Sequence, residues 1–178
     1  PIDVVHRVFQ LGQQYSWHIQ SYVDDHLLCH HKNWQSDHYE QQTGAVAEFL
    51  GDTIYTLSSE PNKLIAIDTE EGIDRIIDIL TPLVGNQVTL VRSQRDFLEI
   101  TAPNVSKGRA LVQLALDNNL SLENIVSFGN AENDISMLSE TGYSVAVSNA
   151  TEHVKSVANE VCGHHNEDGV AHWIEKNL

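Results

Sequence analysis

The sequence predicts an α/β protein in two parts: an α+β unit over residues 1–100 and a set of parallel βα units over residues 101–178. Two observations lead to this prediction. In the first part, strands with alternating polar and apolar residues follow one another directly, as in antiparallel pairs, and helices stand before and between them. In the second part, short apolar strands alternate with helices, which is typical of a parallel sheet.

The composition is that of an ordinary globular protein, with 41% hydrophobic and 20% charged residues. The net charge of −15 argues against nucleic acid or an anionic membrane as the main partner, because both require a positive field. No apolar run reaches the ~18 residues of a spanning helix, and the N-terminus lacks the pattern of a secretion signal. We therefore expect a cytoplasmic protein in which Cys29 and Cys162 are reduced thiols.

In the first part, apolar residues three or four apart predict helices, and alternating residues predict strands. The expected elements are a helix over 3–12, two strands around a tight turn at Asp24–Asp25, a strand over 63–68, a helix over 71–85 and paired strands over 87–93 and 96–101. The segment 32–62 is polar and weakly patterned. There we expect a helix from Gln42 to Leu50 and a strand from Thr53 to Leu57.

In the second part, we expect helices over 106–119, 131–142, 151–158 and 168–177, and buried strands over 125–129 and 143–147. The first helix should begin at a Ser106 cap and turn Leu111, Leu114 and Ala115 inward. In parallel sheets, ligands bind beyond the C-terminal ends of the strands. Asn130 and Asn149 follow the two strands and should lie there.

Three runs carry a family resemblance: VSKGRAL at 105–111, IVSFGNAENDISML at 125–138 and the run from GYSVAV to WIEK at 142–176. They resemble the C-terminal half of the haloacid dehalogenase-like (HAD) phosphatases, and more narrowly the Cof-type sugar and cofactor phosphatases. The fourth motif of that family is Gly-Asp-x-x-Asn-Asp followed by Met-Leu. On this resemblance, residues 1–100 are the α+β cap domain that chooses the substrate, and residues 101–178 are the C-terminal half of a Rossmann-like core with a parallel sheet.

The resemblance implies Mg²⁺-dependent hydrolysis of small phosphomonoesters such as sugar phosphates. Lys107 then takes the position of the phosphate-binding lysine, and Asp134 takes the second acidic position of the fourth motif, whose aspartates hold the metal. Asn133, Asn149 and Asn166 match further motif positions.

Asn130 stands where the family has the first aspartate of the fourth motif, a direct metal ligand. A neutral amide oxygen can still coordinate Mg²⁺, but it brings no charge and binds more weakly. We therefore expect Mg²⁺ binding to be weakened or lost at this position.

The family also opens with a strand that runs into Asp-x-Asp-Gly-Thr, and the 178 residues contain no such run in the family's order. We therefore expect the chain to be inactive alone, either as an N-terminally truncated relative or as a piece of a longer protein. The missing strand would leave residues 125–129 with an unpaired apolar edge. This predicts a homodimer, or an N-terminal fragment that completes the sheet.

Two other interpretations stay open. The chain could be a catalytically silent binding or interaction module, or a decaying truncated protein. It could also be a capless phosphatase from residue 63 onward, in which Asp68 and Glu70 imitate Asp-x-Asp and Ser93 imitates the second motif.

A cluster of His26, Cys29, His30, His31 and His38 suggests zinc by residue type. However, it has neither the paired cysteines nor the helical histidine spacing of a zinc site. We expect these histidines to be ordinary surface residues.

Overall fold

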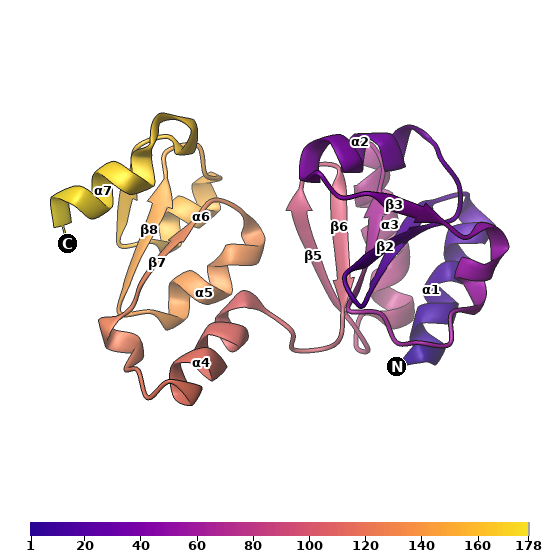
Figure 1. Cartoon of the computed structure of the whole chain (residues 1–178), viewed down its shortest axis with the longest axis horizontal. Helices are drawn as coiled ribbons and strands as arrows, with labels where there is room; N and C mark the ends of the chain where they lie inside the picture. The colour runs from indigo at the N-terminus through magenta and orange to yellow at the C-terminus, as the bar shows by residue number, and fades with distance from the viewer. Residues whose placement is uncertain (178) are drawn as a thin grey trace. The chain divides into compact units, whose positions relative to one another are not determined.

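The protein is described by a computed structural model that covers residues 1–177. The chain divides into two compact units, Pro1–Asn104 and Val105–Leu178, four residues later than the sequence suggested (Figure 1). Below they are called unit 1 and unit 2. Together they make a mixed α/β fold with a parallel sheet in unit 2, which confirms the expected fold class.

Unit 1 is built on a six-stranded sheet in the order β3-β2-β1-β4-β6-β5. Its strands are β1 (His18–Val23), β2 (His26–Cys29), β3 (Ala47–Phe49), β4 (Lys63–Ile67), β5 (Thr89–Gln94) and β6 (Phe97–Thr101). All neighbours pair antiparallel except β2 and β3. The β1–β2 turn places Asp24 and Asp25 at φ values of 48° and 66°, as the tight turn predicted from the sequence requires.

Helices cover both faces of this sheet. They are α1 (Ile2–Tyr15), α2 (Trp34–Thr43), the 3₁₀ helix η1 (Gly51–Thr56) and α3 (Glu70–Val84). Leu64 and Ala66 of β4 share one apolar core with α1, α3 and η1, whereas Ile65 and Ile67 share the other core with Tyr39 of α2. Successive strand residues point to opposite faces, so β4 is buried on both sides.

The sequence prediction for 32–62 was wrong in detail. The helix begins at Trp34, not Gln42, because the Asn33 side chain accepts a hydrogen bond from the Ser36 amide and caps it. It ends at Thr43, and Gly44 caps its C-terminus with a φ of 73°. The expected strand at Thr53–Leu57 is mostly the 3₁₀ helix η1, which brings Ile54 into the core.

His18 at the start of β1 is a buried polar residue, with 8% of its surface exposed. Its Nδ1 lies 2.9 Å from Asn33 Nδ2 and its Nε2 lies 3.1 Å from Gln20 Oε1. The Asn33 oxygen already caps α2, so Asn33 Nδ2 must donate and His18 Nδ1 must accept. His18 is therefore the neutral tautomer that carries its proton on Nε2.

His18 should lower the stability of unit 1 when the pH falls below about 6.5. Burial lowers the pKa of His18 below 6.5, so in this range the unfolded chain takes up a proton that the folded chain refuses, which favours unfolding. Hydrogen exchange of the β1 amides, measured at several pH values, should show a smaller pH slope in His18→Gln. An unchanged slope would contradict the assignment.

Unit 2 has a three-stranded parallel sheet in the order β7-β8-β9. Its elements are α4 (Lys107–Asp117), η2 (Leu122–Asn124), β7 (Val126–Gly129), η3 (Glu132–Asp134), α5 (Ile135–Glu140), β8 (Tyr143–Val147), α6 (Glu152–Val157), β9 (Glu160–Cys162), η4 (His165–Glu167) and α7 (Gly169–Asn177). Its core joins Leu138 of α5, Ala146 of β8 and Val154 of α6. On β7, the Phe128 ring packs edge-on against Trp173 of α7.

Three features of unit 2 differ from the sequence prediction. The short strand β9 was not expected. The helix expected from 131 begins as the 3₁₀ turn η3. Leu114 does not face inward but is 59% exposed, whereas Gly108 and Ala115 are the buried residues of α4, which packs against α5.

Over residues 1–177, no helix is both long and apolar enough to cross a membrane. Cys29 and Cys162 are free thiols and belong to different units.

Candidate functional site

Lys107 is held at the start of α4 by two local features. The Ser106 side chain caps the helix by accepting from the Arg109 amide at 3.2 Å. Gly108 then lets the backbone of α4 touch the start of α5: a Cβ at position 108 would lie 2.4 Å from the Ser136 carbonyl oxygen. The Gly108 amide also donates to Ser136 Oγ at 3.1 Å. These contacts fix Lys107 beside the loop that follows β7.

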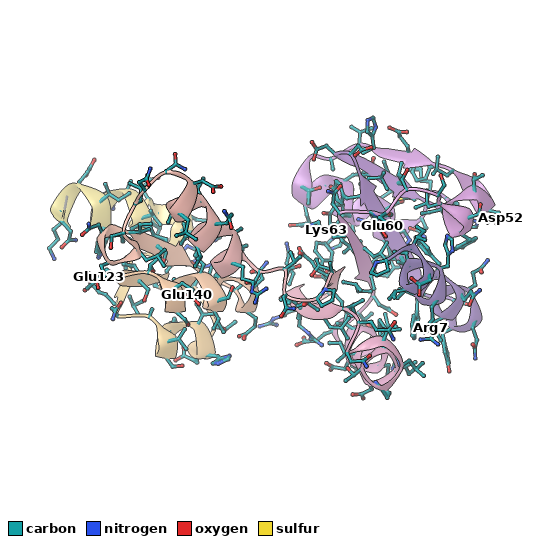
Figure 2. The ribbon with its side chains drawn as sticks, turned by 90° about the horizontal axis from the view of Figure 1, so that it is seen from below. Arg7, Asp52, Glu60, Lys63, Glu123 and Glu140 are labelled. Atoms are coloured by element: carbon teal, nitrogen blue, oxygen red, sulfur yellow. The ribbon has the colours of Figure 1, made fainter. Side chains whose placement is uncertain are left out.

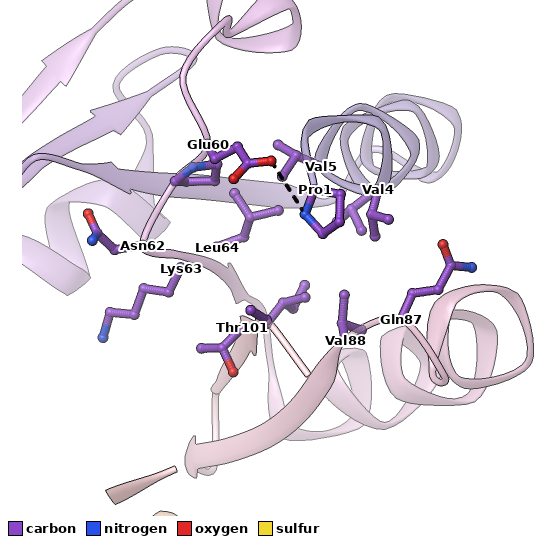
Figure 3. A pocket seen from close by; sticks show the side chains of 14 residues that line it. Pro1, Val4, Val5, Glu60, Asn62, Lys63, Leu64, Gln87, Val88 and Thr101 are labelled. Carbon is purple, nitrogen blue, oxygen red and sulfur yellow. Dashed lines mark ion pairs between the residues drawn. The ribbon is translucent and has the colours of Figure 1, made fainter. Parts of the chain in front are cut away.

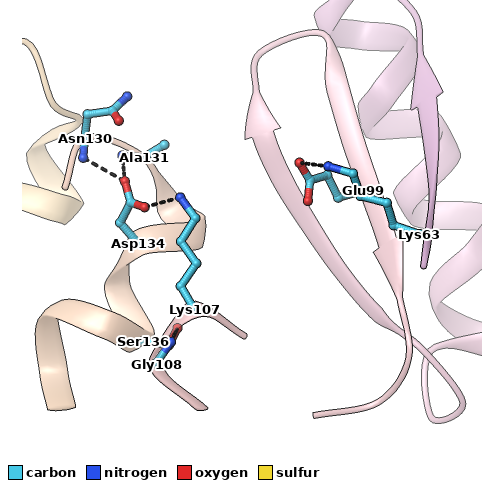
Figure 4. A network of polar contacts seen from close by, with 8 residues as sticks. All are labelled: Lys63, Glu99, Lys107, Gly108, Asn130, Ala131, Asp134 and Ser136. Atoms are coloured by element: carbon cyan, nitrogen blue, oxygen red, sulfur yellow. Dashed lines mark hydrogen bonds and ion pairs between the residues drawn. The ribbon is translucent and has the colours of Figure 1, made fainter. Parts of the chain in front are cut away.

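Asp134 is the buried centre of the site, with only 3% of its surface exposed. Its Oδ2 accepts from the backbone amides of Asn130 at 2.8 Å and Ala131 at 3.1 Å. Its Oδ1 accepts from Lys107 Nζ in an ion pair (Figure 4). The carboxylate therefore shapes the β7–α5 loop and orients a lysine that is half-exposed.

Asn130 joins this network through its backbone and not through its side chain. Figure 4 shows the amide of Asn130 turned away from Asp134, and the residue is exposed. Gly129, just before it, allows the loop to close, because a Cβ there would lie 2.7 Å from Asp134 Cβ. The side chain of Asn130 is thus free to meet something outside the network.

The parallel register brings the C-terminal ends of β7, β8 and β9 to one edge of the sheet. Asn149 lies there and its Oδ1 accepts from the His165 amide at 3.2 Å, which ties the β8 end to η4. Asn166 is exposed, and its backbone amide donates to His164 Nδ1 at 3.1 Å. Asn133 is half-buried in η3 beside Asp134.

Sequence reasoning missed Glu132. Its two carboxylate oxygens accept from Thr151 Oγ1 at 3.0 Å and from His153 Nδ1 at 2.8 Å. It therefore links the loop after β7 to the start of α6, at the same edge of the sheet. Glu132 is a carboxylate inside the fourth-motif run, so the sequence could have marked it as a candidate. Its hydrogen-bond partners Thr151 and His153 are 19 and 21 residues away, and only the fold shows that they are close.

The residues of unit 2 do not by themselves fit a Mg²⁺ site. Mg²⁺ prefers carboxylate oxygens, and the buried carboxylate of this edge, Asp134, already holds Lys107 and two backbone amides. Asn130 offers one neutral oxygen. Over residues 1–177, no group of three or more histidine, cysteine, aspartate or glutamate residues is placed to hold a metal.

The histidine and cysteine cluster of unit 1 is dispersed by the fold. His26 pairs with Glu48 and His38 pairs with Asp96, at 2.5 and 2.6 Å. Cys29 is buried, which raises the pKa of its thiol to about 12, and it donates to Gln20 Oε1. Only His30 and His31 remain together.

The capless interpretation conflicts with the topology. Asp68 follows β4, which lies inside the six-stranded sheet of unit 1 between β1 and β6, antiparallel to both. A nucleophile strand in this interpretation would have to lie in the parallel sheet with β7. Ser93 lies in β5, at the edge of the unit 1 sheet.

Unit 1 has a small cavity of about 100 Å³ between α1, the start of β4 and the end of β6 (Figure 3). Its lining is mainly apolar, from residues such as Val4, Leu64 and Val88, with Lys63 and Glu60 at its side. The Lys63 ammonium pairs with Glu99 at 3.3 Å. This cavity has no group of convergent polar atoms comparable to the site in unit 2.

Comparison with known proteins gives a consistent result. Residues 1–174 match the family model for haloacid dehalogenase-like hydrolases. The chain is 31% identical to TM0651 of Thermotoga maritima, whose crystal structure is known. The superposition has a TM-score of 0.82 and covers 100% of this chain and 67% of TM0651.

Two curated relatives differ in the share of their own length that this chain matches. The 5-amino-6-(5-phospho-D-ribitylamino)uracil phosphatase YitU of Bacillus subtilis is 25% identical over 99% of this chain and 66% of its own. The chloroplastic endoribonuclease YBEY of Arabidopsis thaliana is 32% identical over 70% of this chain, but over 24% of its own. Across the first four curated relatives, the chain spans between 24% and 66% of their length.

The Lys107–Asp134 ion pair lies within the region that the family model matches. Because that match extends over residues 1–174, the chain belongs to the haloacid dehalogenase-like hydrolase family.

Proposed function

We propose that this chain supplies the cap and part of the catalytic core of a phosphohydrolase that acts on small phosphomonoesters such as sugar phosphates. The observation that carries the proposal is the ion pair of Lys107 with buried Asp134, beyond the C-terminal end of β7. Ligands of parallel sheets bind at this edge. Phosphatases among the relatives support the reaction class.

In this proposal, Lys107 binds the phosphate and Asp134 is its positioning residue. A cation held beside the transferring phosphoryl group neutralises the negative charge of its oxygens. Lys107 suits this role because its stem is fixed at a helix start while its side chain remains half-exposed. Asp134 sets the direction of the ammonium and is too fully engaged to act as a nucleophile.

The phosphoryl-accepting aspartate would then come from a segment outside residues 1–178. Phosphatases of this superfamily generally use Mg²⁺, and the same segment would supply the carboxylates that unit 2 lacks for it. Within residues 1–177, β7 pairs only with β8, so its other edge is open to an added strand. An N-terminal segment is the occupant we favour, and a second copy of the chain is the alternative.

The activity prediction uses two proteins: the chain alone, and the chain fused after a family segment that opens with Asp-x-Asp-Gly-Thr. With Mg²⁺ and p-nitrophenyl phosphate or sugar phosphates, we expect turnover only from the fusion. In the fusion, Lys107→Ala should lower kcat/KM by about 100-fold or more. Lys155→Ala is the matched control, because Lys155 pairs with the exposed Glu152 on its own helix, α6.

Two outcomes would contradict the proposal. Turnover by the chain alone would mean that an acceptor exists within it. A folded but silent fusion would favour the catalytically silent binding module. Size-exclusion chromatography of the chain alone tests the alternative occupant, since a dimer that dissociates in Phe128→Pro would place a second copy at the β7 edge.

A further inference from the structure

His30 and His31 form a pair that the proposed phosphatase site does not use. They follow β2 and line an open pocket of about 440 Å³ at one end of the unit 1 sheet, together with His18, Asn33, Asp52 and Tyr55. Their rings are nearly perpendicular, with centroids 4.7 Å apart, and their Nδ1 atoms are 2.5 Å apart. Two imidazole nitrogens this close share either a proton or a cation.

Asp52 decides which nitrogen of His30 carries the proton. Its carboxylate oxygen lies 2.9 Å from His30 Nε2. An ionised carboxylate only accepts hydrogen bonds, so Nε2 must donate and the neutral ring leaves a lone pair on Nδ1. That lone pair points at His31 Nδ1. Histidines that bind metals in proteins almost always donate their other N–H to a carboxylate, a backbone carbonyl or a water.

His31 can complete a chelate because it is exposed. Two nitrogen ligands at about 2.0–2.1 Å from one metal stand about 3 Å apart. His31 Nδ1 now donates its proton to His30 Nδ1, so chelation needs a small rotation of the His31 ring and the neutral tautomer of His31 that carries its proton on Nε2. His18, the third histidine of the pocket, is not available, since both of its nitrogens are engaged with Asn33 and Gln20. The structure therefore offers two protein nitrogens, and the open pocket leaves room for water or a small anion.

We propose that His30 and His31 bind one divalent transition-metal ion of the Zn²⁺ or Cu²⁺ type through their Nδ1 atoms, with Asp52 holding His30 in place. Imidazole ligands favour these ions, whereas Mg²⁺ prefers oxygen ligands. The site is thus chemically distinct from the Mg²⁺ chemistry of the family and independent of the proposed phosphatase function. With two protein ligands it should bind more weakly than sites with three or four.

The chain contains its own control pair. His164 and His165 are also adjacent, with ring centroids 4.9 Å apart. There, however, His164 Nδ1 accepts the backbone N–H of Asn166 at 3.1 Å. That lone pair is occupied, so this pair should not chelate a metal in the same way.

The test is Zn²⁺ titration by calorimetry and electron paramagnetic resonance with one equivalent of Cu²⁺, both on the full chain. We expect one site, with hyperfine coupling from two nitrogens. His31→Ala should lose one nitrogen coupling and weaken binding at least tenfold. Asp52→Ala should weaken binding by about 10- to 100-fold. Asp52 is 93% exposed and lies at the surface (Figure 2), so both variants should fold, which circular dichroism checks.

His165→Ala should leave the affinity and the Cu²⁺ spectrum unchanged. The proposal fails if His31→Ala binds as tightly as the original chain. It also fails if His165→Ala loses as much affinity as His31→Ala, because the metal would then be held by histidines in general.

Discussion

Asp134→Ala is expected to lower the free energy of unfolding of unit 2 by about 3 kcal/mol. The substitution removes the acceptor of two backbone amides, those of Asn130 and Ala131. It also leaves Lys107 without its partner, although the half-exposed ammonium can recover water. Most of the loss should therefore come from the unpaired amides of the loop, as when a helix loses its cap.

The matched control is Glu140→Ala. Glu140 is an exposed carboxylate at the end of α5, the helix that Asp134 directly precedes (Figure 2), so its loss should cost little. Hydrogen exchange of the β7 and β8 amides would measure both variants and report on unit 2 alone. In Asp134→Asn, the remaining carbonyl oxygen can still accept from the loop, so this variant should recover part of the stability. Equal stability of Asp134→Ala and Glu140→Ala would show that the network adds nothing.

Most of the parallel half of the fold could be predicted because its longer helices and its strands β7 and β8 have strong local signals, unlike the three-residue strand β9. Ser106 caps the helix that it was expected to cap. Short apolar segments that alternate with helices, as in unit 2, indicate the strands of a parallel sheet. The exception is Leu114, since helical spacing shows which residues share a face but not whether a partner covers that face.

The segment 32–62 could not be predicted because its structure depends on partners far along the chain. The three-residue strand β3 exists through its pairing with β2, 20 residues earlier. The start of α2 depends on Asn33, whose other contact is His18. Ile54 enters the core from a 3₁₀ helix, which has neither of the two periods used to find helices and strands.

At the candidate site, Lys107 and Asp134 could be identified from the sequence, but the ion pair between them could not. Motif matching assigned Lys107 to the phosphate and Asp134 to the metal, whereas in the structure the Asp134 oxygens accept hydrogen bonds from Lys107 and the loop amides. Glu132 was missed because its importance lies in contacts to α6. A motif gives the residue types of a site, but which of these residues are hydrogen-bonded to one another can be seen only in the folded structure.

Gly108→Ala is expected to destabilise unit 2 by about 2 kcal/mol, although alanine is the better helix former by about 1 kcal/mol. The added Cβ would lie 2.4 Å from the Ser136 oxygen and 2.6 Å from its carbonyl carbon. These are backbone atoms at the start of α5, so they cannot rotate away. Helix α4 must instead move outward, which also breaks the hydrogen bond from the Gly108 amide to Ser136 Oγ.

Gly12→Ala separates this clash from the general effect of adding a methyl group to a helix. Gly12 lies in α1, and its added Cβ would meet the end of the flexible Ile19 side chain at 2.8 Å, which can change rotamer. Urea denaturation should therefore show little change or a slight gain in Gly12→Ala and a clear loss in Gly108→Ala. Because Lys107 is the neighbour of Gly108, an outward shift of α4 also draws its ammonium away from Asp134. In the fused phosphatase, Gly108→Ala should then reduce kcat/KM while the protein is still folded. Full activity in that variant would mean that the close approach of α4 and α5 does not position the lysine.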